Sequence, residues 1–427
     1  MGNLLRALAL VLCVLLVCRP AGAYSLLTHE QLIDLTWQSS IVPLLRSRYP
    51  RITDAQLDEA RSYAYAGCVI QDVGYYPFGD PFLSDLTHYV RTGDFIVHLF
   101  RDAKDANQLA FAIGALSHYI GDNIGHSQAT NRAVGEDFPK LAEKYGPVVT
   151  FSESKSAHVR TEFGFDINEI VHHRLAPVHY LRHVGLNIPT QQLADAFYDT
   201  YGLSADFSKA RARRINVKGF RFAVRSFVPR IAYAITLLHR NHMPAESMSP
   251  DLEKLSIEVA RVAAENDWDK YRKKAGIGTY SLAGLIFVLP KVGPLRLVAI
   301  KDPNQDTEKE YIRSVNQSTD LLRSTLVRFG TPHQTLPNRD LDTGAPIRPG
   351  GYRLADETYA KLLHMLVVDS HHTVPPGLKT DILNYYADPN APIQTKKNPK
   401  QWARVQSELQ VLRTMPVSNQ PIATETE

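Results

Sequence analysis

The stretch 117–127, SHYIGDNIGHS, constrains the fold more than any other part of the chain, because it places His118, Asp122 and His126 four residues apart in succession. The preceding run QLAFAIGAL is apolar and helix-forming, so the stretch is predicted to continue one helix. Four residues advance an α-helix by about 400°, which lines the three side chains along one face with roughly 40° of drift per step. Two imidazoles and a carboxylate suit Zn²⁺. The stretch therefore predicts a metal-binding face, with a buried polar network or a solvated face as the alternative.

Helical periodicity extends through most of the chain. Helices are expected over 29–48, 54–66, 83–102, 106–126, 136–145, 166–184, 190–201, 218–241, 251–275, 306–328, 355–369 and 400–413. Strand-like alternation is scarce, and Pro and Gly separate the helical segments. The apolar stretch 280–300 contains Pro290 and Pro294, and it is expected to hold a short hairpin or buried loop segments; a membrane-contacting element is the alternative. The chain is therefore expected to be all-α.

The N-terminal residues 1–23 have the pattern of a secretory signal peptide. One Arg precedes an almost wholly apolar run, and Ala21 and Ala23 place small residues at −3 and −1 before a cleavage site. The run is too short for a membrane-spanning helix. Cleavage after Ala23 would make Tyr24 the mature N-terminus and send the protein to a secreted or periplasmic location. It would also leave Cys68 as the only cysteine, so no internal disulfide is expected.

Composition and charge are those of a soluble globular chain, with 44% hydrophobic and 22% charged residues. The formal net charge of +4 falls to about +2 when Arg6 and Arg19 leave with the signal peptide, so global charge gives no argument for a nucleic-acid or anionic partner. The segment 209–225 is locally basic, with seven Lys and Arg residues and no acid. It is interpreted as a solvated face; anionic lipid, a substrate phosphate and single-stranded nucleic acid are the alternative partners.

Further ligands are needed because one helix face cannot surround a metal ion. The candidates are Tyr24 and His29 at the expected mature N-terminus, Asp72 in CVIQDVGYYPFGDP, His88 in DLTHYV, and His158 with Glu162 in SAHVRTEFGFD. A free terminal amine and its carbonyl can chelate a metal together with a nearby imidazole. His158 and Glu162 repeat the four-residue spacing of the first strip, and His98 is the alternative to His88.

In combination and in order, these segments resemble the zinc-dependent phospholipase C family over about residues 24–185. The superfamily includes secreted single-strand nucleases and the catalytic domain of glycosylphosphatidylinositol-specific phospholipase D. The resemblance implies an all-helical phospholipase C/nuclease-like domain with a tri-zinc cluster, in which a processed N-terminal residue is a ligand. The implied ligand groups are the backbone of Tyr24 with His29 on one zinc, Asp72, His88 and His118 on a second that Asp122 bridges to the first, and His126, His158 and Glu162 on the third.

Two departures from the family pattern qualify the resemblance. Tyr24 stands where many members have Trp, a change that leaves the ligating backbone atoms in place. Three residues separate Asp122 from His126, whereas most phospholipases C and the nucleases have five. The shorter spacing and the run AHVRTEFGFD look closer to the glycosylphosphatidylinositol-specific phospholipase D branch, although the propeller repeats of that enzyme are not evident.

The resemblance implies a secreted, zinc-dependent phosphodiester hydrolase, most similar to a phospholipase C, in which a metal-bound hydroxide attacks the phosphodiester of a phospholipid. Asp72 is the candidate catalytic residue, as a base or as a group that orients the attacking water. A single-strand-specific nuclease and a metal-stabilised binding module without turnover are the alternatives. Phospholipid is the expected partner, and peripheral membrane contact and nucleic-acid substrates stay open.

Three regions are expected along the chain: a signal peptide over 1–23, the zinc-dependent phospholipase C-like catalytic domain over 24–245, and a mostly helical C-terminal region over 246–427 that ends in a disordered tail. Outside the ligand set, Asp166 and Glu30 are expected to orient imidazole N–H groups.

Overall fold

The computed structural model describes residues 25–76, 79–204, 207, 217–246, 248–329, 335–368 and 373–418. Within these ranges the only β-structure is a pair of isolated bridges, Arg339 with Pro346 and Val374 with Val417, and the remaining regular structure is helical. The all-α prediction is confirmed. None of the described helices is both long and apolar enough to cross a lipid bilayer. The expected signal peptide and Tyr24 lie outside the described residues.

The helices follow one another in two runs, over residues 26–201 and 217–414. The first run is α2 (Leu26–Thr36), η1 (Trp37–Ile41), α3 (Val42–Arg48), α4 (Asp54–Gly67), η2 (Gln71–Gly74), α5 (Pro81–Tyr89), α6 (Thr92–Arg101), α7 (Ala106–Gly125), η3 (His126–Thr130), α8 (Asn131–Asp137), α9 (Pro139–Tyr145), α10 (Lys155–Val171), α11 (Val178–Val184) and α12 (Thr190–Tyr201). The second run is α13 (Val217–Phe222), η4 (Ala223–Phe227), α14 (Val228–His239), α15 (Pro250–Glu265), α16 (Trp268–Tyr271), α17 (Ile277–Val288), η5 (Gly293–Val298), α18 (Gln305–Arg328), α19 (Arg353–Val368), α20 (Pro376–Tyr385), η6 (Gln394–Lys397) and α21 (Pro399–Thr414).

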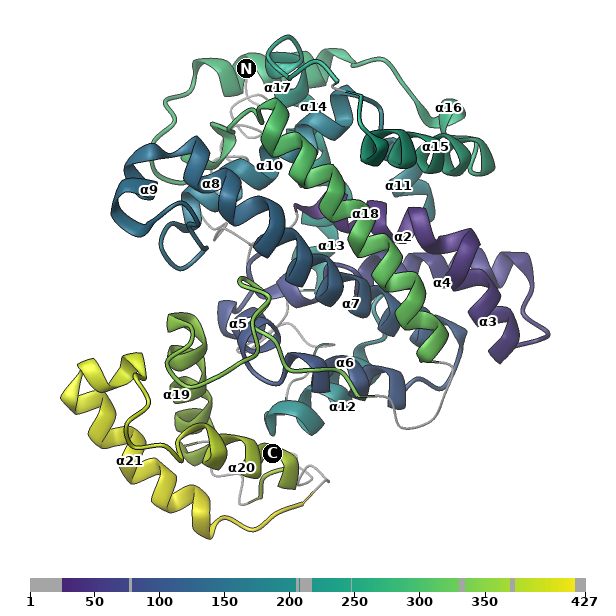
Figure 1. Ribbon diagram of the computed structural model, residues 1–427. Coiled ribbons are helices and arrows are strands. Elements are labelled where there is room, and N and C mark those ends of the chain that lie inside the picture. The colour runs from purple at the N-terminus through teal and green to yellow at the C-terminus, as the bar shows by residue number, and fades with distance from the viewer. Residues whose placement is uncertain are drawn as a thin grey trace, which may run out of the picture.

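Helix α7 lies at the centre of the molecule, in contact with α2, α4, α6 and α18 (Figure 1). It begins where the Asp105 side chain accepts a hydrogen bond from the Gln108 backbone N–H, which satisfies one of the unpaired amides of the first turn. From Ala110 to Asp122 every residue is buried. A helix that is buried on all sides needs neighbours on all sides, and this requirement brings several ligand-bearing helices around it.

Helices α4 and α7 cross at two glycines. A Cβ atom on Gly114 would lie 2.2 Å from the carbonyl oxygen of Ala64, and a Cβ atom on Gly67 would lie 2.1 Å from that of Phe111. Only glycine lets the two backbones come this close. The crossing brings the C-terminal end of α4 against the turn of α7 that carries His118.

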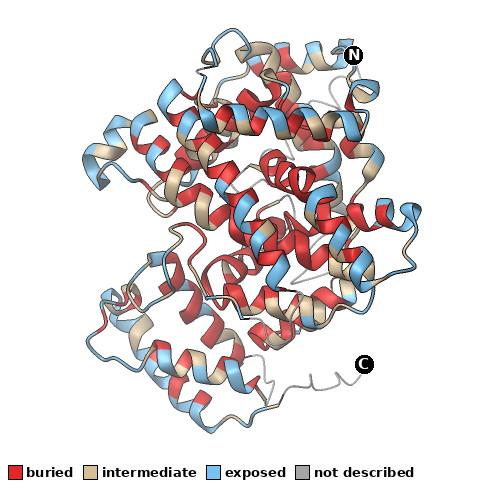
Figure 2. Cartoon of the chain, turned by 45° about the vertical axis from the view of Figure 1, so that its right-hand side comes forward, coloured by how far each residue is buried: buried red, intermediate tan, exposed pale blue. Residues whose placement is uncertain are grey.

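The region after residue 246 packs onto these central helices. Helix α18 lies across α2 and α7, and α19, α20 and α21 gather at the bottom of Figure 1, where α19 contacts α5. Figure 2 shows buried residues running through the interior of both parts, with exposed residues on the outer helix faces. The main hydrophobic cluster accordingly joins residues from α2 to α21, such as Leu32, Leu116, Leu322 and Leu412.

Several expected helices divide where the backbone interrupts them, among them 251–275, which separates into α15 and α16 at the left-handed Asp267. The segment 83–102 forms α5 and α6, because Val90 is extended and Arg91 is left-handed with φ 47°. The expected helix 166–184 is wrong in its start and its continuity: α10 already begins at Lys155, capped by the Ser154 side chain, and the chain turns at Pro177 before α11.

The expectation of a hairpin or buried loop segments at 280–300 is wrong. The run before Pro290 forms α17, which packs against α14 on one side only. Ala283 and Ile286 face inward and are buried, whereas Phe287 and Val288 are exposed. No strand lies among the described residues to pair with this run, so a helix is the conformation that satisfies its backbone hydrogen bonds internally.

Candidate metal centre

The structure brings eight of the nine predicted ligands into one buried region. They come from α2 (His29), η2 (Asp72), α5 (His88), α7 (His118 and Asp122), η3 (His126) and α10 (His158 and Glu162). Every one of these side chains is buried. The ninth, Tyr24, immediately precedes the described residues.

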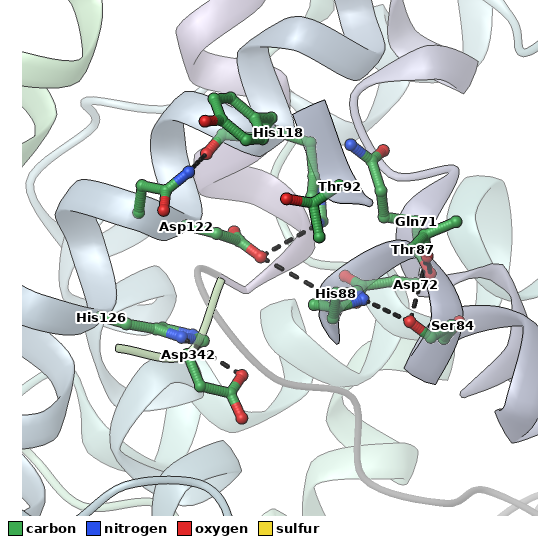
Figure 3. Close-up of polar contacts among 12 residues, drawn as sticks. Gln71, Asp72, Ser84, Thr87, His88, Thr92, His118, Asp122, His126 and Asp342 are labelled. Atoms are coloured by element: carbon green, nitrogen blue, oxygen red, sulfur yellow. Dashed lines mark hydrogen bonds and ion pairs between the residues drawn. The ribbon is translucent and has the colours of Figure 1, made fainter. Parts of the chain in front are cut away.

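The first group, here called the paired site, consists of His29, Asp72, His88, His118 and Asp122. The two oxygens of the Asp122 carboxylate face different sides of the site. Oδ1 lies 3.2 Å from His29 Nε2, while Oδ2 lies 3.0 Å from His118 Nε2 and 3.5 Å from His88 Nε2. Asp72 Oδ1 completes the second side, 3.4 Å from His88 Nε2. Figure 3 shows His88, His118 and Asp72 converging on Asp122.

The second group consists of His126, His158 and Glu162. It is here called the third triad, because these residues are the ones implied for the third zinc. Glu162 Oε1 lies 2.8 Å from His158 Nε2 and 3.4 Å from His126 Nε2. The two imidazole rings are perpendicular, with centroids 4.8 Å apart. His126 is the first residue of η3, the π-helical turn in which the end of α7 widens. This turn brings the His126 side chain to the two ligands on α10.

Main-chain carbonyls orient two imidazoles of the paired site. His88 Nδ1 lies 2.7 Å from the Ser84 carbonyl oxygen, and His118 Nδ1 lies 2.9 Å from that of Cys68. A carbonyl accepts a hydrogen bond, so Nδ1 carries the proton and Nε2 presents its lone pair to the site. The glycine crossing of α4 and α7 is what brings the Cys68 carbonyl within reach.

The donor set fits divalent zinc. The buried atoms His88 Nε2, His118 Nε2, Asp122 Oδ1 and Oδ2, and His158 Nε2 make no hydrogen bond within the described part of the chain. Buried polar atoms are normally hydrogen-bonded, so a convergent set of this kind indicates a missing partner. Neutral imidazoles and carboxylates within 4.8 Å of one another are the ligand types and spacing that zinc takes.

The two groups differ in their electrostatics. At His88 and His118 burial disfavours the charged imidazolium, but the carboxylates of Asp122 and Asp72 outweigh it and raise both pKa values. Burial likewise opposes ionisation of Asp122, yet His118 and its neighbours hold the pKa of that carboxyl well below its usual range. At His158 burial prevails and lowers the pKa to about 4.

Asp342 is a site residue that the sequence pattern did not indicate. Its Oδ1 lies 3.5 Å from His126 Nδ1 (Figure 3). Its Oδ2 accepts hydrogen bonds from the hydroxyls of Tyr89 and Tyr352. The neighbouring Leu341 N–H donates to the His88 carbonyl, which fastens this loop to α5. The only signal in the run NRDLDTGAP is a pair of acids, which marks a turn as readily as a metal site.

Asp166, which was expected to orient an imidazole N–H group, instead anchors the start of the described chain. Its carboxylate accepts hydrogen bonds from the backbone N–H groups of Leu27 and Thr28 and from the Thr28 hydroxyl. Burial raises the pKa of Asp166 to about 6. These contacts hold the first turn of α2, and with it His29, against α10.

His98, the alternative to His88, lies outside the cluster. Its Nδ1 lies 2.8 Å from the Thr200 hydroxyl, and burial together with Arg101 and Arg91 lowers its pKa to about 4. His88 is therefore the histidine of this pair that the fold brings to the site.

The comparison with known families agrees with this ligand pattern. Residues 28–207 match the family model described as zinc dependent phospholipase C. This region is similar to the zinc-dependent phospholipase C family. The resemblance inferred from the motifs is thereby confirmed, and the phospholipase C region contains all eight described ligands but not Asp342. No curated protein and no solved structure matches the chain.

Proposed function

We propose that this protein is a zinc-dependent phosphodiester hydrolase of the phospholipase C type, acting on phospholipid. The match to the family model supports zinc and hydrolytic chemistry. The observation that carries the proposal is the position of the Asp122 carboxylate, since one oxygen faces His29 and the other faces His118 and His88. A carboxylate placed in this way could hold a metal ion on each side.

Three zinc ions per chain are proposed. The backbone of Tyr24 with His29 would hold the first, and Asp72, His88 and His118 the second, with Asp122 between them. The third triad would hold the third. When bound, zinc supplies positive charge to a phosphate oxygen and lowers the pKa of water.

The chain itself contributes a proton acceptor. Asp72 Oδ1 is buried and makes no hydrogen bond within the described residues, and it lies 3.4 Å from His88 Nε2 at the edge of the paired site. It is placed to take a proton from the water that attacks phosphorus. The water oxygen bonds to phosphorus as the bond from phosphorus to the glycerol oxygen breaks. The leaving oxygen then takes up a proton, and diacylglycerol and the phosphorylated headgroup are released.

The test compares the zinc-loaded protein on phosphatidylcholine and on single-stranded DNA. We expect release of phosphocholine, its loss in His88→Gln, and its retention in the matched variant His98→Gln, which alters a partly buried histidine outside the cluster. Cleavage of DNA alone would replace the lipid proposal with the nuclease alternative. Stoichiometric zinc without turnover of either substrate would favour a metal-stabilised binding module.

We also propose that the protein is exported and cleaved after Ala23. The support is the anchoring of Leu27 and Thr28 by Asp166, which fixes the first described turn and the ligand His29 that follows it. N-terminal sequencing of the exported protein, together with zinc quantification, tests this. A mature chain that begins elsewhere would remove Tyr24 from the ligand set, and less than one zinc per chain would contradict the three-zinc cluster.

A further inference from the structure

The outer face of α17 is an exposed apolar surface. Ile277 is 87% exposed, Phe287 73% and Val288 72%, and Tyr280 lies between them on the same face. The helix sequence IGTYSLAGLIFV contains no charged residue. A contiguous exposed apolar stripe is unusual on a soluble protein and marks a site of contact with a protein or a membrane.

The length of α17 limits what this stripe can do with a bilayer. Its 12 residues span about 18 Å at 1.5 Å per residue, which is short of the roughly 30 Å hydrocarbon core. Its inner side is held by the protein, since Ile286 and Leu282 border Ile231 of α14. A helix of this kind can insert its outer side chains into the headgroup region while it lies along the surface.

A cationic cavity opens beside the first turn of α17. Its volume is about 820 Å³, and Gly278, Thr279 and Leu282 of α17 form part of its wall. Six Arg and Lys side chains line it: Arg182 from α11, Arg230 and Arg240 from α14 and its end, and the run Arg272, Lys273 and Lys274 that leads into α17. Among the described residues that line the cavity, none is Asp or Glu.

The positive charges of the cavity act on one another. Burial and the nearby Arg230 and Arg225 lower the pKa of Arg182, and burial with Lys273 and Arg182 lowers that of His179. Arg272 is the exception, since Asp269 lies 3.3 Å from its Nε. An anion placed in the cavity would relieve this repulsion.

The basic segment joins the same surface. Arg225 donates a hydrogen bond to the carbonyl of Arg182, and Arg182 donates to that of Arg225. Arg225 therefore extends the positive area along the cavity edge. In Figure 1, α17 and α14 lie at the top of the molecule, away from α19, α20 and α21.

We propose that the apolar face of α17 and the adjoining cationic cavity form a docking surface for an anionic phospholipid bilayer. The apolar side chains enter the headgroup region, and the Arg and Lys groups bind lipid phosphates. Charge complementarity decides for an anionic bilayer over a second apolar protein face, because six cations without an acidic partner in the cavity wall would oppose burial against protein. Docking of this kind goes beyond the proposed reaction and does not require turnover.

The test is co-sedimentation of the zinc-loaded mature protein with vesicles of phosphatidylcholine, with and without phosphatidylglycerol. Centrifugation is brief and at low temperature to limit lipid hydrolysis, and thin-layer chromatography afterwards confirms that the lipid is intact. We expect the anionic vesicles to bind about tenfold or more tightly, with salt weakening the binding. Phe287→Ser/Val288→Ser and Lys273→Glu/Lys274→Glu should each weaken binding about tenfold, without changing hydrolysis of a monomeric short-chain phosphatidylcholine.

Matched controls lie on other exposed surfaces. Val327→Ser/Val368→Ser removes equally exposed apolar groups, and Lys140→Glu/Lys400→Glu makes the same charge change elsewhere. Vesicle binding that is absent in the wild type, or that the controls weaken as much as the α17 and cavity variants, overturns the inference. The inference is also overturned if the α17 and cavity variants lose binding only to a single-stranded DNA oligonucleotide and not to vesicles. That result would assign the surface to nucleic acid. Vesicle binding by an inactive protein would refute only the proposed function.

Discussion

The paired site and the third triad use the same ligand types but are held differently. The paired site has two carboxylates for three imidazoles, and the main-chain carbonyls of Ser84 and Cys68 orient two of its histidines. The third triad has one carboxylate, and its His126 faces Asp342, which comes from far along the chain. The paired site is thus built by helix crossings inside the family region, whereas the third triad also depends on a loop that lies beyond that region in the sequence.

The largest effect should come from Asp122, which serves both sides of the paired site. Asp122→Asn should remove both of its zinc ions and lower phosphodiesterase activity by on the order of 1,000-fold or more. Zinc quantification alongside kinetics measures this. Glu162→Gln is the comparison variant and should lose only the ion of the third triad. Equal losses of zinc in the two variants would show that the groups are not separable.

Asp342→Asn should act on the third triad alone. Loss of a carboxylate behind a ligating imidazole costs about 10–100-fold in metal affinity. The affinity of the third-triad zinc should fall by this amount in competition with a chelator, while the paired site keeps its ions. A matched control is Asp381→Asn, because Asp381 also accepts a hydrogen bond from a tyrosine hydroxyl but lies outside the centre. If both variants behave like wild type, Asp342 has no role in orienting His126.

Gly114→Ala should disturb the paired site through the helix crossing. The added Cβ would meet the Ala64 carbonyl at 2.2 Å, so α4 and α7 must separate, at a cost of about 1–3 kcal/mol in unfolding free energy. Denaturant unfolding measures the cost, and zinc content reports whether the Cys68 carbonyl still orients His118. Gly284→Ala, where nothing lies within 4 Å of the new Cβ, should leave stability equal or slightly higher.

The smallest effect is a difference in pH dependence. In the metal-free protein the raised pKa values of His88 and His118 keep these rings protonated to higher pH than usual, whereas His158, with a pKa of about 4, stays neutral. Zinc must displace the proton, so acidification should release the ion held by His88 and His118 before that of the third triad. Zinc content after dialysis at successively lower pH measures the order, and Glu162→Gln should lack the last step. A single release step in the wild type would contradict this difference.

The sequence predicted those contacts that short-range periodicity controls. The four-residue spacing placed His118 and Asp122 together on α7, and His158 and Glu162 together on α10, as the structure has them. It did not predict Asp342, because the contact with His126 spans 216 positions and the loop has no repeating pattern. For the run that forms α17, the sequence offered a membrane-contacting element only as the alternative, since an uncharged apolar run looks the same whether it packs in a core or lies at a bilayer surface.

One hydrogen bond has a consequence for how the centre is assembled. The Thr28 hydroxyl meets Tyr311 of α18 across 283 positions of sequence, one residue from the ligand His29. Contacts of such long range form only after most of the chain has collapsed, so the first ligand is fixed among the last. We therefore expect zinc to bind only after α18 has packed against α2. A chain truncated before α18 would keep all eight described ligands in its sequence and still fail to hold the metal.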